Sequence, residues 1–126
     1  IESAVISIKF ELELSGTVSE LRSFRERLAG LSAGERAEIS LEVDGEASPY
    51  DRYLLAACVT ATEGLLRLSV ESDRLVVDGS LEALIQFASS FDFPDDTETG
   101  YHVHCEPAEW HPLIHPNSMP LVISVD

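Results

Sequence analysis

The residues best suited to chemistry lie in the last quarter of the chain, which holds all four histidines. In the stretch YHVHCE every second residue is polar: His102, His104 and Glu106. These three side chains share one face if the stretch is an extended strand. Two neutral imidazoles two residues apart can bind one metal ion, and a carboxylate can complete the site. The spacing therefore leaves a small metal-binding protein or a metal-dependent enzyme open as one interpretation.

The other two histidines, His111 and His115, are four residues apart in a Pro-rich loop and could supply a further ligand. The competing interpretation is a polar strand face, whose imidazoles form hydrogen bonds with the neighbouring loop. We favour this second interpretation and expect no cofactor and no metal.

Motifs for covalent catalysis are missing from the chain. No G-x-S-x-G sequence occurs, and the few glycines do not form a phosphate-binding loop. Cys105 would point to the opposite face of its strand from His104, which is a poor geometry for a Cys–His pair. We therefore predict a protein without catalytic activity, in which Cys58 and Cys105 are reduced core thiols.

The charge is strongly acidic, since 23 acidic residues stand against eight basic ones and give a net charge of −15. Such a surface repels nucleic acid and anionic membranes and attracts basic partners. No signal peptide and no apolar run near the length of a transmembrane helix is recognisable. The expectation is a cytoplasmic protein that binds neither nucleic acid nor a membrane.

The acidic residues are unevenly distributed, because residues 75–126 contain nine of them and no Lys or Arg. The segment DFPDDTETG is the densest part, and a single Trp follows it in the Pro-rich loop. Carboxylates steer a basic partner, and a packed Trp is a typical binding hot spot. Solubility alone is the alternative explanation. The predicted partner-binding residues are Asp92, Asp95, Asp96, Glu98 and Trp110.

The elements that would position these residues follow from hydrophobic periodicity. Alternation over 4–14 predicts one long strand, and helical spacing predicts helices over 18–31 and 80–91. Shorter alternating stretches predict further strands. The economical fold is a single α+β domain over 1–126, with two helices packed on one face of a predominantly antiparallel sheet. The open sheet face would carry a second set of acids: Glu11, Glu13, Glu38, Glu42 and Glu71.

An internal similarity appears when the chain is shifted by half its length. LELSGTVSELRSF then aligns with LVVDGSLEALIQF, and Gly16 aligns with Gly79. The half-repeats would be 1–63 and 64–126. A duplication explains this match, but any strand–Gly–cap–helix junction would favour the same residue types.

The second half also carries an ordered set of motifs: LVVDGS with LEALIQFA, then GYHVHCE, and finally NSMPLVISV. In this order they resemble the immunity protein 32 family of bacterial polymorphic toxin systems, over about 65–126. The resemblance implies a protein that binds and neutralises a cognate toxin made by the same cell, with no catalysis. It transfers no contact residues to this chain. The chemistry of the toxin and the oligomeric state stay open.

Overall fold

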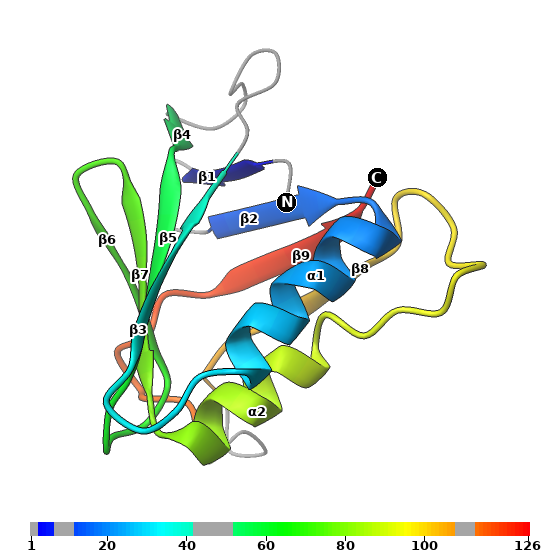
Figure 1. The fold of residues 1–126 in the computed structure, drawn as a ribbon. Coiled ribbons are helices and arrows are strands. Elements are labelled where there is room, and N and C mark those ends of the chain that lie inside the picture. Colours follow the sequence, from blue (N-terminus) through cyan, green and yellow to red (C-terminus); the bar gives the residue numbers. More distant parts are fainter. Residues whose placement is uncertain (1–2, 7–11, 42–51, 108–112) are drawn as a thin grey trace.

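The computed structural model describes residues 3–6, 12–41, 52–107 and 113–126 of the 126-residue chain (Figure 1). Nine strands and two helices are formed by these residues. Their bounds are β1 (Ser3–Ile6), β2 (Leu12–Gly16), α1 (Val18–Ala29), β3 (Arg36–Ser40), β4 (Arg52–Leu54), β5 (Ala56–Ala61), β6 (Arg67–Glu71), β7 (Arg74–Gly79), α2 (Leu81–Ser89), β8 (His102–Cys105) and β9 (Leu121–Val125).

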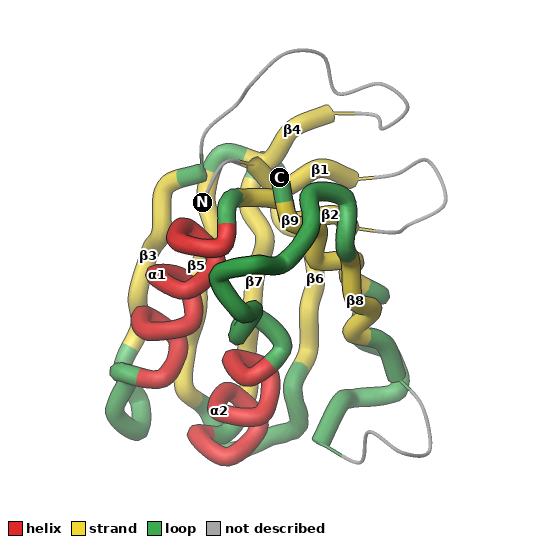
Figure 2. Tube along the Cα trace, turned by 90° about the vertical axis from the view of Figure 1, so that its right-hand side faces the viewer, coloured by secondary structure: helices red, strands yellow, loops and turns green. Residues whose placement is uncertain are grey.

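The strands form two sheets. The first sheet has the order β4-β1-β2-β9-β8 and the second β3-β5-β7-β6. Neighbouring strands are antiparallel except for β2 with β9 and β5 with β7, which are parallel. The two helices lie side by side and pack against the sheets, as Figures 1 and 2 show from two directions.

The predicted α+β class is therefore confirmed, together with the two helices and the predominantly antiparallel pairing. The prediction of one sheet is wrong, because the strands divide between two. The single strand over 4–14 is also wrong. β1 and β2 pair antiparallel with each other, with Ala4 opposite Leu14 and Ile6 opposite Leu12. Residues 7–11 lie outside the described residues; they include Ile8 and Phe10, which the alternation over 4–14 predicts to be buried.

The two halves of the chain use corresponding strand pairings. A hairpin precedes each helix, β1–β2 before α1 and β6–β7 before α2. An antiparallel pair follows each helix, β3–β5 in the first half and β8–β9 in the second. Both parallel ladders join one half to the other. Each sheet thus combines the hairpin of one half with the later strand pair of the other, which is the arrangement that half-repeats over 1–63 and 64–126 would produce.

Both helices begin within one residue of their predicted starts, each after a residue that caps it. The Thr17 hydroxyl accepts a hydrogen bond from the Glu20 amide, and the Glu20 carboxylate accepts one from the Thr17 amide, which is a complete capping box. Ser80 caps α2 through the amide of Ala83. Gly79 precedes this cap without a side chain because a Cβ there would lie 3.2 Å from the Leu66 Cα. The chain therefore passes from strand to helix at a point of close backbone contact.

One hydrophobic core lies between the sheets and the helix pair. It draws apolar residues from β2, β5, β7, β9 and both helices. An aromatic cluster joins the helices: the Phe91 ring centroid lies 4.9 Å from that of Phe24 and 5.2 Å from that of Phe87. The relative arrangement of α1 and α2 is thus fixed by buried rings.

The segment after residue 112 covers the free edge of β6. The Leu68 amide donates a 2.8 Å hydrogen bond to the buried Ser118 hydroxyl, and the Leu68 carbonyl accepts one from the Met119 amide. Main-chain bonds from Leu66 to Leu113 and from His115 to Leu66 extend the contact. This segment carries the chain from the edge of the second sheet to β9 in the first.

Replacing Ser118 by Ala is expected to destabilise the protein by about 1–3 kcal/mol, because the Leu68 amide would stay buried without an acceptor. Urea unfolding measures the change. The exposed neighbour Asn117, replaced by Ala, is the matched control and should have little effect. Equal stability of the Ser118 and Asn117 variants would show that this hydrogen bond is dispensable.

Candidate functional site

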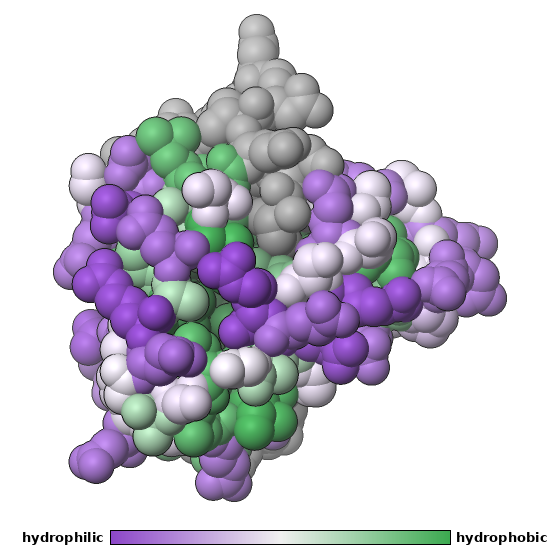
Figure 3. Space-filling model, in the orientation of Figure 1, coloured by the Kyte–Doolittle hydropathy of each residue, from purple (hydrophilic) through white to green (hydrophobic). Residues whose placement is uncertain are grey.

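The acidic loop, residues 92–100, connects α2 to β8 and projects from the molecule (yellow in Figure 1). Its predicted contact residues are all exposed. Figure 3 shows that this projection is hydrophilic over most of its surface. The structure therefore brings together four of the five predicted residues on one accessible segment: Asp92, Asp95, Asp96 and Glu98. The fifth, Trp110, lies outside the described residues and stays a prediction.

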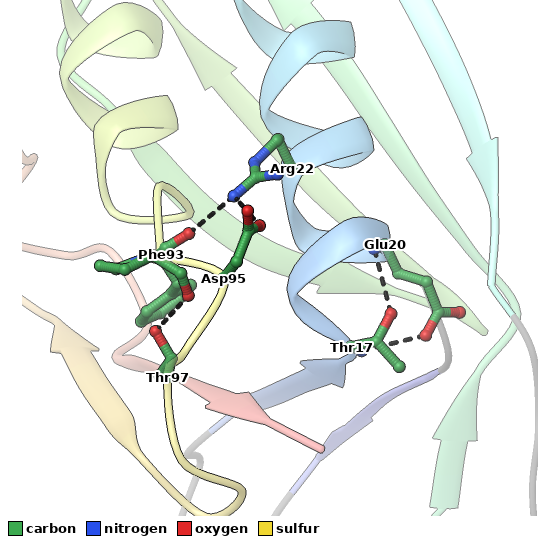
Figure 4. A network of polar contacts seen from close by, with 7 residues as sticks. Thr17, Glu20, Arg22, Phe93, Asp95 and Thr97 are labelled. Atoms are coloured by element: carbon green, nitrogen blue, oxygen red, sulfur yellow. Dashed lines mark hydrogen bonds and ion pairs between the residues drawn. The ribbon is translucent and has the colours of Figure 1, made fainter.

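An arginine of α1 holds the acidic loop in place (Figure 4). The Arg22 Nη2 donates to the Phe93 carbonyl over 3.0 Å and lies 2.9 Å from Asp95 Oδ1. The Asp95 carboxylate is thus paired with a cation of the protein itself. By contrast, no cation in the described part of the chain pairs with Asp96 or Glu98. These carboxylates are available to an external cation, whereas that of Asp95 acts partly in fixing the loop.

Further hydrogen bonds hold the middle of the acidic loop and its C-terminal end. The Thr97 hydroxyl and amide both donate to the Pro94 carbonyl, over 2.6 and 3.1 Å. The Gly100 amide donates to the Val125 carbonyl, and the Val125 amide donates to the Tyr101 carbonyl. The loop is therefore tied to the end of β9 and presents its carboxylates from a defined backbone.

An aromatic side chain beside the acids does not follow the alternation of the YHVHCE stretch. That alternation places Tyr101 on the same side as Cys105, toward the core, but the Tyr101 side chain is 55% exposed, because β8 begins only at the next residue. The Tyr101 ring stands edge-to-face on the buried Phe93 ring, with centroids 6.0 Å apart. The two rings and four loop residues line an open cleft of about 380 Å³, formed by Asp92, Phe93, Pro94, Thr97, Glu98 and Tyr101.

The His face of β8 is arranged as the alternation predicted. His102 and His104 are exposed, and their ring centroids are 5.3 Å apart. His102 Nδ1 lies 3.3 Å from the Gly100 carbonyl oxygen, and His115 Nδ1 accepts a hydrogen bond from the Asn117 amide. Among the described residues, which include Glu106 but not His111, no three potential ligands converge on a metal position. The structure thus shows hydrogen-bond contacts for His102 and His115, and among the described residues it places no third ligand beside His102 and His104.

Removing metals is expected to leave the melting temperature unchanged. A structural zinc ion would contribute strongly to folding, so its removal would lower the melting temperature markedly. The measurement compares thermal unfolding of untagged protein with and without EDTA, alongside metal analysis. Stoichiometric zinc together with a large EDTA-dependent drop would favour a site at His102, His104 and Glu106 instead.

A small pocket of about 140 Å³ lies between α2, β8 and the start of the final segment. Phe87, Cys105 and Ile114 are among its lining residues. The Cys105 thiol is buried, and desolvation, aided by the negative charge of Glu106, raises its pKa to about 11. The thiol therefore stays protonated near neutral pH, as expected of a core residue and not of a nucleophile.

Alkylation of Cys105 should be much slower in the folded protein than in urea-unfolded protein at pH 8. The thiolate is the reactive form, and at pH 8 its fraction falls about tenfold for each unit by which the pKa rises. The folded-state rate should increase as the pH approaches 11. Peptide mass spectrometry after timed iodoacetamide treatment measures this rate, and a rate equal to that of unfolded protein would contradict a buried, protonated thiol.

The open face of the second sheet is not the acidic surface that was predicted. Arg36 and Arg74 donate to the Cys58 sulfur over 3.6 and 3.7 Å, and Arg74 lies 3.8 Å from a Glu38 carboxylate oxygen. The pKa of Arg36 is raised, mainly by its hydrogen bond to the thiol. Glu13 belongs to the other sheet, and Glu71 lies on the opposite edge strand from Glu38. The predicted set of sheet acids, of which Glu11 and Glu42 lie outside the described residues, therefore does not form one patch.

No family model, curated protein or solved structure matches this chain. Neither described helix has the length and apolar composition needed to cross a membrane.

Proposed function

We propose that this protein is an immunity-type binding protein, which neutralises a cognate toxin of a bacterial polymorphic toxin system through its acidic surface. The observation that carries the proposal is the acidic loop. It is exposed, projects from the domain and is held by Arg22 and by the end of β9. A fixed loop loses little conformational entropy on binding, so its carboxylates can stabilise a complex effectively.

The expected partner is basic. A toxin that acts on nucleic acid has a cleft with cationic side chains for phosphates, and carboxylates on a rigid loop complement such a cleft. Binding there would block the toxin without any reaction catalysed by the inhibitor. The resemblance to the immunity protein 32 family supports the same role, and a protein with this role would act in the cytoplasm of the cell that makes the toxin.

Growth rescue tests this proposal. The proposal implies a toxin domain encoded by a neighbouring gene, and this domain is expressed alone, with this protein, and with an unrelated acidic protein of similar size. We expect growth only with this protein, and a stable complex of the purified pair in size-exclusion chromatography and calorimetry. Continued toxicity, or the absence of a complex with an active toxin domain, would refute the proposal.

A further inference from the structure

The cleft beside Tyr101 is lined both by aromatic rings and by carboxylates. Tyr101 is one of the few large apolar side chains that are more than half exposed in the described part of the chain. Its ring is supported edge-to-face by Phe93, while Asp92 and Glu98 line the same cleft. An exposed aromatic ring that is flanked by carboxylates offers a π face and negative charge to the same ligand.

We infer that this cleft receives an arginine side chain of the partner protein. The planar guanidinium group can stack on the Tyr101 ring and donate hydrogen bonds to Glu98 and Asp92, which line the same cleft. The methylene groups of the arginine would cover Pro94 and the edge of Phe93. The inference rests on the proposed function for the identity of the partner, whereas the chemistry of the cleft rests on its own lining.

An arginine fits this cleft better than a lysine. An ammonium ion is a compact, strongly hydrated charge, and it loses more hydration when it approaches an aromatic ring. A guanidinium group is weakly hydrated and flat, and it presents several donors in one plane. The ring face suits the flat, weakly hydrated guanidinium group, and the two separate carboxylates suit its several donors.

The probe for the test is ethylguanidinium, titrated into the intact protein and followed by NMR. The ring signals of Tyr101 and Phe93 and the amide signal of Thr97 should shift, and the shifts should fit one dissociation constant on the order of 1–10 mM, as expected for so small a ligand. Butylammonium should bind at least threefold more weakly. Absence of shifts at the cleft, or equal binding of both cations, would overturn the inference.

Matched variants separate the aromatic contribution from simple attraction to an acidic protein. Tyr101→Phe keeps the ring and should change the dissociation constant less than twofold. Tyr101→Leu keeps an apolar side chain without the ring and should weaken binding at least fivefold. Because Tyr101 is exposed, both variants should fold, and unchanged signals elsewhere in the spectrum would verify this. Equal binding by Tyr101→Leu and the unchanged protein would overturn the inference.

The ethylguanidinium titration and the growth-rescue experiment can fail independently of each other. Growth rescue without ethylguanidinium binding would overturn the arginine site and leave the immunity role standing. Ethylguanidinium binding that depends on the Tyr101 ring, without growth rescue, would support the arginine site and refute the immunity role. In the complex with the cognate toxin, Tyr101→Leu should increase the dissociation rate at least tenfold, whereas Tyr101→Phe should leave it within threefold.

Discussion

Replacing Phe91 by Ala is expected to destabilise the protein by about 3–5 kcal/mol. The Phe91 side chain is fully buried and contacts the rings of both Phe24 and Phe87. Its removal would leave a cavity between the two helices and end both ring contacts. Small domains have a total stability of about 5–15 kcal/mol, so this variant should unfold at much lower urea concentration.

The matched control is Ile85→Ala on α2, since the Ile85 side chain is 58% exposed. Alanine has the higher helix propensity and removes a side chain that is mostly exposed, so the change should stay within about 0.5 kcal/mol. Phe91→Leu, which refills part of the cavity, should give an intermediate loss. If Phe91→Ala and Ile85→Ala shifted the urea midpoint equally, the aromatic cluster could not be what holds α1 and α2 together.

Local rules predicted the helices accurately because their determinants lie within a few residues of one another. The capping box at Thr17, the cap at Ser80 and the 3.6-residue periodicity all act over one or two turns. The alternation of β8 likewise placed His102 and His104 outside and Cys105 inside. In each case the residues that determine the local structure are close neighbours in the sequence.

The division into two sheets could not be predicted in this way. Alternation says which face of a strand is buried, but it does not say which strand lies beside it. The parallel ladders join β2 to β9 across most of the chain, and β5 to β7 across the intervening strand β6. The hairpin within residues 4–14 was missed for a related reason, because the even spacing of apolar residues continues through both of its strands. Both the division into two sheets and the break within residues 4–14 depend on which strands pair in the folded protein.

The candidate site was predicted in part. The density of carboxylates identified the acidic loop, and exposure follows directly from their charge. Tyr101 was missed, because it continues the alternation of β8 although it precedes the strand, and its ring turns out to pack on Phe93. The glycine directly before it, Gly100, has φ 94°, a conformation typical of a turn. That glycine is the signal that could have placed Tyr101 in the turn.

Reversing two carboxylates of the acidic loop, with Asp96→Lys and Glu98→Lys combined, should slow association with the cognate toxin by about tenfold or more at low salt. Both side chains are exposed and have no cation partner within the described residues. The reversal therefore changes the electrostatic field that an approaching partner meets, without breaking an ion pair inside the protein. Asp95 is unsuitable for this test because its replacement would also break the contact with Arg22. Stopped-flow kinetics at several salt concentrations gives the association rate.

A control with the same change in net charge identifies the location of the effect. Glu63→Lys combined with Glu71→Lys reverses two exposed carboxylates, one in the turn before β6 and one at the end of β6, in the sheet that does not contain β8. Charges beyond about 10 Å are largely screened at 0.1 M salt, so this control should slow association far less than the loop variant at that salt concentration. If both double variants slowed association equally, net charge alone would explain the steering. If the unchanged protein associated at a rate independent of salt, the acidic loop would have no part in capturing the toxin, and binding would have to depend on apolar contacts such as the predicted one at Trp110.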